Sequence, residues 1–248
     1  MPNGTRELAL STEEHWWAVL AGISLLVMAI VGGFAYGYAH ANLHVPNNAI
    51  ATASAIGKRP ILLLLTILLW CVVAVLDLVA TFAIYFTYKR LAPRLSLVAA
   101  SLRLLYTGIL LFAIAHLVPL SLDSETNSGV LAFQSFELVW SGGLVIFGFH
   151  LLALAQLVRI VRFPWIPIAL LLALGGVGYI VLEGFEFLGS DSVAIPAFIQ
   201  KALAIPMILG ELLFAVLSIA ARMPRLTGFK PFQGVCDKWR ISENDNFG

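Results

Sequence analysis

Six long apolar stretches divide the chain, and polar residues gather between them. A helix needs about 20 apolar residues to cross a hydrocarbon core of about 30 Å, and it satisfies its own backbone hydrogen bonds there. Runs such as ILLLLTILLWCVVAV lack the alternation of a porin strand, so the pattern predicts an all-α membrane protein, a six-transmembrane-helix bundle. The predicted spans lie at about 16–39, 61–88, 95–120, 136–158, 164–188 and 193–221.

The links between these stretches leave no room for a further folded unit. We therefore interpret 1–248 as a single integral membrane domain with a tail at 222–248. The link from His40 to Pro60 is long enough for a short surface helix. The link from Ser121 to Ser135 is polar and acidic, and it lies outside the predicted spans.

Composition agrees with this interpretation. Hydrophobic residues make up 60% of the chain and charged residues 12%, unlike a water-soluble domain. A net charge of +1 leaves no basic surface, so we expect no nucleic-acid partner. Cys71 and Cys236 lie far apart in the predicted topology and lack CxxC spacing, which argues against a disulfide framework or a cysteine zinc site.

Lysine and arginine residues gather on one side of the predicted spans, eleven against three. Because positive flanks stay in the cytoplasm, both the N-terminus and the C-terminus are predicted to be cytoplasmic. The first apolar stretch follows acidic residues and exceeds a signal-peptide core, so we expect it to be retained as a span. The eleven are Arg6, Lys89, Arg90, Arg94, Arg159, Arg162, Arg222, Arg225, Lys230, Lys238 and Arg240, and the three are Lys58, Arg59 and Lys201.

Four ionisable residues fall inside the spans and form a predicted buried polar layer: Asp77, Arg103, His150 and Glu211. Each costs about 2.5 to 3.5 kcal/mol on insertion and therefore needs a partner or a wet cavity. At 1.5 Å per residue, all four lie about 12 to 16 Å from the cytoplasmic ends of their helices. Small residues surround Asp77 and Arg103 on neighbouring helices, so we predict an ion pair between them.

This layer has two interpretations. It can serve as a proton or ion relay or a substrate site, or it can lock the bundle as a structural pair. Two acids and one base give a negative layer when fully ionised. The sequence therefore predicts that Glu211 is either protonated or paired with His150.

A second set forms a predicted outer polar cluster: His116, Glu137, Glu183 and Glu186. Imidazole and carboxylate groups can bind a metal, but these residues also lie within about two turns of the outer boundary, where water solvates a rim. Whether a metal binds here is unknown from the sequence. His40 and His44 are four residues apart, but the following Pro46 indicates that the helix has ended, so we interpret them as loop histidines.

No cofactor is expected. Because His116 and His150 fall at opposite leaflets, a conventional haem held by two histidines is not predicted. The chain lacks HExxH, GxSxG, GxxxxGK[ST] and GxGxxG patterns, so no catalytic residue is assigned. The sequence leans away from an enzyme and leaves an intramembrane enzyme open. Glycines on three spans are typical of close helix packing: Gly33, Gly37, Gly142, Gly143, Gly148, Gly175, Gly176 and Gly178.

The stretch from Phe136 to Glu186 resembles bacterial six-span membrane proteins known only as a domain of unknown function. Those proteins carry an FGLHLLLLGYLIYRS-type helix, an Ile-Pro turn and a GLGY-type helix. The segment YKRLAPRLSLVAASLRLLYTGIL is similar to their third helix, whereas Ile168 replaces a basic residue that often follows the Ile-Pro turn. The resemblance implies a multi-pass protein of the bacterial cytoplasmic (inner) membrane and implies no reaction. The matching residues are Gly148, His150, Leu151, Leu152, Ile166, Pro167, Gly176, Gly178 and Tyr179.

Three functions remain open. The first is a non-enzymatic accessory or assembly component, or a self-associating bundle, with the lipid bilayer and a membrane protein or a second copy as partners. The second is a small proton-coupled transporter or channel that uses the buried polar layer, which Pro206 supports by interrupting the helix near Glu211. The third is an intramembrane metal or redox enzyme that uses the outer cluster.

Overall fold

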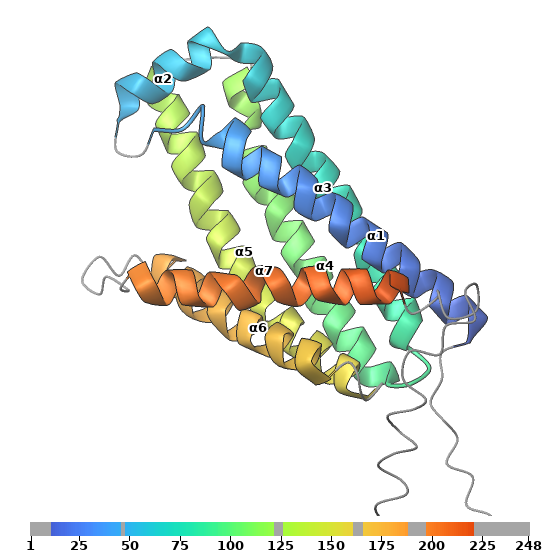
Figure 1. Cartoon of the computed structure of the whole chain (residues 1–248). Helices are drawn as coiled ribbons and strands as arrows, with labels where there is room; N and C mark the ends of the chain where they lie inside the picture. Colours follow the sequence, from blue (N-terminus) through green and yellow to red (C-terminus); the bar gives the residue numbers. More distant parts are fainter. Residues whose placement is uncertain (1–10, 46–47, 122–125, 161–165, 188–196, 221–248) are drawn as a thin grey trace, which may run out of the picture.

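The computed structural model describes residues 11–45, 48–121, 126–160, 166–187 and 197–220, and these residues form helices without a strand among them (Figure 1). Two short helices of other types also occur, the π-helix η1 (Ala35–His40) and the 3₁₀ helix η2 (Val118–Ser121). The α-helices are α1 (Thr12–Phe34), α2 (Ala49–Lys58), α3 (Pro60–Tyr88), α4 (Pro93–Ala115), α5 (Thr126–Ile160), α6 (Ile166–Phe187) and α7 (Ala197–Ala220).

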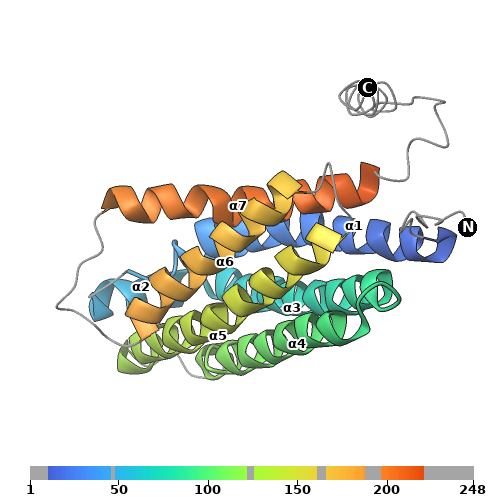
Figure 2. The same cartoon turned by 90° about the horizontal axis from the view of Figure 1, so that it is seen from below.

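The six long helices form a closed ring in chain order. Each of α1, α3, α4, α5, α6 and α7 packs against the next, and α7 packs back on α1. Figure 1 shows that consecutive long helices run in opposite directions, and Figure 2 shows α4 and α7 on opposite sides of the ring. The short helix α2 lies at the end of the bundle where α1 finishes and α3 begins, and it packs on α5.

Five described helices are long and apolar enough to cross a membrane, and the described part of α7 adds a shorter apolar stretch at Ile205–Ala220. On α3, Leu68, Val75 and Phe82 are exposed on the outer face. Such a surface is unfavourable in water and favourable in lipid. The fold is therefore that of an α-helical membrane protein. The five helices are Thr12–His40, Pro60–Tyr88, Pro93–Leu120, Gly129–Ile160 and Ile166–Phe187.

One predicted boundary is wrong. α5 begins at Thr126, so much of the predicted polar link before residue 136 is helical. Gly129, Phe133 and Phe136 are buried on one face of this extension, and a Cβ on Gly129 would lie 2.8 Å from Ile56 of α2. Packing of this apolar face outweighs the polar residues between. The surface helix expected between His40 and Pro60 is α2, and the predicted tail at 222–248 lies outside the described residues.

Glycines bring the backbones of α5 and α6 together. A Cβ on Gly148 would lie 2.7 Å from the carbonyl oxygen of Gly176, and a Cβ on Gly176 would lie 2.7 Å from that of Gly148. A side chain at either position would force the helices apart. By contrast, Cβ atoms on Gly33 and Gly37 would meet nothing within 4 Å, so the packing role predicted for that pair is wrong.

The start of α1 is fixed to the turn between α3 and α4. Ser11 and Glu14 form a capping box at the N-terminus of α1. The Glu14 carboxylate also accepts two hydrogen bonds from Arg90, at 2.7 and 2.9 Å. These bonds raise the pKa of the Arg90 guanidinium, because they favour its charged form. The contact closes the end of the bundle opposite α2.

Candidate functional site

The middle of the bundle contains the predicted ion pair. Asp77 of α3 and Arg103 of α4 are both fully buried, and Asp77 Oδ1 lies 2.5 Å from Arg103 Nη2. The hydroxyl of Thr107, one turn further along α4, donates a hydrogen bond to the other carboxylate oxygen, Asp77 Oδ2. Both oxygens of the carboxylate therefore have partners.

His150 of α5 extends this layer. Its Nδ1 lies 2.8 Å from the carbonyl oxygen of Ala99, and its Nε2 lies 3.1 Å from Arg103 Nη1. A carbonyl only accepts and a guanidinium only donates, so we assign the proton to Nδ1 and a neutral ring to His150. Because both nitrogens are engaged, the predicted pairing of His150 with Glu211 is not formed. The layer joins α3, α4 and α5.

A cavity of about 440 Å³ opens beside this layer, inside the ring of helices. All six long helices contribute to its wall, which explains why no single stretch of sequence revealed it. Aromatic and aliphatic side chains make up most of the lining, and Asp77 and Glu211 are its two carboxylates. The aromatic residues of the wall are Tyr36, Trp70, Tyr106, Trp140, Phe147 and Tyr179.

The two carboxylates of the cavity differ in their surroundings. Asp77 is held by Arg103 and Thr107, as described above. The carboxylate of Glu211 on α7 has no hydrogen bond or ion pair within the described part of the chain, although it acts electrostatically on Arg103 and Asp77. With one guanidinium behind the wall and two acids on it, the cavity is complementary to a cation.

The predicted outer cluster is not formed as one group. His116 is partly exposed, and its Nδ1 lies 3.0 Å from the carbonyl oxygen of Phe112 in the preceding turn. Glu183 accepts a hydrogen bond through its backbone carbonyl from Ser141, at 3.0 Å. Glu137, Glu183 and Glu186 all act electrostatically on Tyr36, so these three acids share one region without His116.

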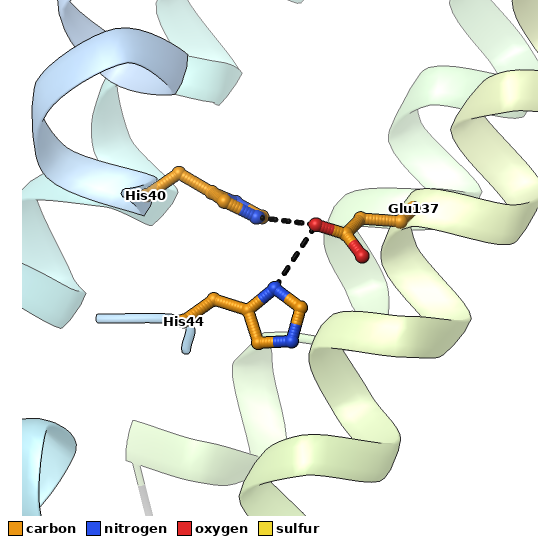
Figure 3. A group of neighbouring side chains, drawn as sticks. All are labelled: His40, His44 and Glu137. Carbon is orange, nitrogen blue, oxygen red and sulfur yellow. Dashed lines mark hydrogen bonds and ion pairs between the residues drawn. The ribbon is translucent and has the colours of Figure 1, made fainter. Parts of the chain in front are cut away.

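Glu137 instead contacts two histidines that sequence reasoning set aside (Figure 3). Its Oε1 lies 2.9 Å from His40 Nε2 and 3.0 Å from His44 Nδ1. Only 5% of the His40 side chain and 4% of the His44 side chain are exposed. The interpretation of these residues as loop histidines is wrong for His40, which ends η1, and right for His44, which lies in the turn after it. Their burial was not predicted. Their spacing of four was the available signal, but the burial of the turn that carries His44 was not visible in the sequence.

Fold and cavity together define a helical membrane protein with a polar interior. The chain belongs to the family described as a domain of unknown function, DUF4386, whose family model matches residues 20–217. This match confirms the predicted family. The matched range includes both polar clusters described above, from His40 to Glu211. Comparisons with curated proteins and with solved structures gave no match.

Proposed function

We propose that this protein binds a small organic cation in its central cavity and carries it across the bilayer in exchange for protons. The observation that supports this proposal is the Glu211 carboxylate, which lies without a hydrogen-bonded partner in an aromatic cavity. A carboxylate that faces a largely apolar cavity within the membrane needs either a counter-charge or a proton. A single site that accepts either the organic cation or a proton can couple the movement of one across the bilayer to the movement of the other.

The aromatic wall supports an organic cation over a bare metal ion. Quaternary ammonium groups are attracted to the faces of tryptophan and tyrosine rings, and the cavity offers Trp70, Trp140 and three tyrosines. Its lining also includes Leu25, Met28 and Leu144, which would pack against the apolar body of such a molecule. A volume of about 440 Å³ lies within the range of small-molecule sites.

The accompanying topology is six spans, with both termini in the cytoplasm of a bacterial inner membrane. The alternating helices and the apolar stretch of α7 support a sixth span. The lysines and arginines before α4 and after α5 support the cytoplasmic side. In this topology the surrounding lipid is the partner of the exposed apolar faces.

Binding is tested with benzyltrimethylammonium and its uncharged isostere neopentylbenzene, added to the full-length protein in detergent. We expect the cation to quench tryptophan fluorescence and to bind at least about tenfold more tightly than the isostere, equivalent to about 1.4 kcal/mol. Glu211→Gln should abolish that preference, because it removes the charge and keeps the shape. Equal affinity for both compounds would overturn the proposal.

Two controls separate the cavity from the rest of the molecule. Glu186→Gln removes an exposed carboxylate of α6 that does not line the cavity, so it should leave cation binding unchanged. Transport is measured in proteoliposomes, where a benzyltrimethylammonium gradient should drive counter-movement of protons in wild type and not in Glu211→Gln. Binding without any proton movement would contradict the exchange and would favour an accessory or sensory role.

A further inference from the structure

We propose that His40, His44 and Glu137 form a binding site for a divalent transition metal ion, for which Zn²⁺ is the best match. The three side chains come from the end of η1, from the turn after it and from α5, and their ligand atoms lie within 4.8 Å of one another. This site is separate from the cation cavity, and its failure would leave the proposed function untouched.

The spacing of the ligand atoms suits a tetrahedral ion. Bonds of about 2.0 to 2.1 Å place two tetrahedral ligands about 3.3 Å apart. The two nitrogens lie 2.9 and 3.0 Å from the same oxygen of Glu137. Each nitrogen–oxygen distance would therefore lengthen by a few tenths of an ångström to admit the ion, while the two nitrogens, which lie within 4.8 Å of each other, would both turn toward it. Two imidazoles and one carboxylate also leave a fourth position open, as in zinc sites that bind water or a ligand.

The chemistry of the ligand set selects the class of ion. Imidazole nitrogen suits zinc, copper, nickel and iron, whereas calcium and magnesium prefer oxygen ligands throughout. Glu137 forms ion-pair contacts with histidines only, among the described residues, so no lysine or arginine of this part neutralises it. Two neutral imidazoles and a carboxylate carry one negative charge, which a divalent cation would offset.

The hydrogen bonds of the cluster do not satisfy it. His40 Nδ1 and His44 Nε2 are buried and have no hydrogen-bond partner in the described part of the chain. One nitrogen of each ring therefore contacts the shared Glu137 oxygen, and the other nitrogen has no partner within that part of the chain. Leaving a buried polar atom without a partner costs about 1 to 3 kcal/mol. The ligand atoms of the proposed site are the other two nitrogens, His40 Nε2 and His44 Nδ1, which lie against Glu137. A metal ion bound there would fix the ring protons on His40 Nδ1 and His44 Nε2.

The rings are held in orientation before any ion binds. Phe133 of α5 stacks on His44 with its ring at 5.3 Å and contacts the edge of His40 at 4.9 Å. The turn after His44 is tied to α2, because Thr52 Oγ1 accepts from Val45 N and donates to Val45 O. Such packing and anchoring reduce the entropy lost when ligands become ordered.

Access to the site runs past Glu137. Its side chain is 32% exposed, whereas both histidines are almost completely buried. An ion would first meet the carboxylate and then the two imidazoles behind it. Figure 3 shows both rings directed at the same carboxylate from one side.

The test uses tag-free full-length protein in detergent, stripped with a chelator and titrated with Co²⁺ and then Zn²⁺. We expect one Co²⁺ per chain with visible d–d absorption of a four-coordinate site, and displacement of Co²⁺ by Zn²⁺. His44→Gln should weaken Zn²⁺ binding by at least about tenfold, since loss of outer-shell partners alone costs that much. His116→Gln, which removes a partly exposed histidine outside the cluster, should leave Zn²⁺ binding unchanged.

Two results would overturn the site. Wild-type protein that shows no d–d absorption with Co²⁺ would do so without any variant. Equal Zn²⁺ affinity in wild type and in His44→Gln would show that Zn²⁺ binds elsewhere. If His44→Gln does not fold, Glu137→Gln provides the second test, because it keeps the oxygen acceptor for both rings and removes the charge that the ion needs.

Discussion

Two buried polar clusters of this protein both contain histidine and a carboxylate, but the two carboxylates have different partners. In the middle of the ring, the carboxylate of Asp77 has a guanidinium on one oxygen and a hydroxyl on the other, and His150 uses both ring nitrogens. There Arg103 Nε has no hydrogen-bond partner in the described part of the chain. At the α2 end, one oxygen of Glu137 serves two histidines, and two ring nitrogens have no partner within the described residues.

The difference teaches how to separate a structural cluster from a binding site in a membrane protein. A buried network in which the carboxylate already has a guanidinium as its counter-charge needs no further ion, and it fixes the packing of its helices. A cluster whose carboxylate and imidazoles converge on one point, with no lysine or arginine paired to it among the described residues, is arranged to accept an added cation. Both clusters contain histidine and a carboxylate, and the arginine of the central cluster distinguishes the two.

The largest expected effect comes from removing Arg103, the arginine of the central cluster. Arg103→Met leaves Asp77 buried without its counter-charge, which should lower the free energy of unfolding by about 3 to 5 kcal/mol. SDS titration of the protein in mixed micelles measures this loss. The double variant Asp77→Leu with Arg103→Met should recover at least half of it, because no lone charge remains. A stable Arg103→Met protein would mean that the layer does not lock the bundle.

A smaller effect is expected within the same cluster. Thr107→Val keeps the shape of the side chain and removes the hydroxyl that bonds to Asp77 Oδ2. The loss of a hydrogen bond to a charged group should cost about 1.5 to 3 kcal/mol in the same SDS titration. Thr66→Val is a matched control, because that hydroxyl bonds to the carbonyl of Leu62 in its own helix. An equal loss of stability in both variants would show that the hydrogen bond from Thr107 to Asp77 contributes no more than a bond to a carbonyl within one helix.

The smallest effect on stability is expected at the cluster of His40, His44 and Glu137 when no metal is bound. Glu137→Gln retains an oxygen acceptor for His40 and His44, so the stability of the metal-free protein should change by less than about 1 kcal/mol. Zn²⁺ at 100 times its dissociation constant should then stabilise the wild type by about 2.7 kcal/mol and this variant far less. A large loss of metal-free stability would place Glu137 among the structural residues and remove the contrast between the clusters.

The fold was largely predictable because lipid imposes a simple rule on sequence. Uninterrupted apolar stretches located the five long membrane-crossing helices, and the small residues beside Asp77 and Arg103 predicted their contact. The start of α5 was missed because its buried face, which includes Phe133 and Phe136, is interrupted by polar residues on the other faces. Hydropathy averages over faces and so hides a one-sided helix.

The sites were less predictable, because they depend on distances between segments far apart in the chain. Depth along a helix placed Glu211 near Asp77, and both line one cavity, but depth says nothing about the direction of a side chain. The same reasoning grouped His116 with Glu137 by height alone. The partners of Glu137 come from a turn more than ninety residues earlier, at sequence separations of 97 and 93.

The π-helix at the end of α1 has a consequence for the length of the chain. In η1 the backbone makes a wider turn, and the amide of Ala41 bonds five residues back to the carbonyl of Tyr36. Deleting one residue from this turn would restore the ordinary helical register and rotate the segment beyond it by about 100°. A homologue shortened in this way would retain both histidines and its apolar span, yet neither ring would meet the glutamate. Insertion length, rather than residue identity, would then decide which homologues can assemble the trio.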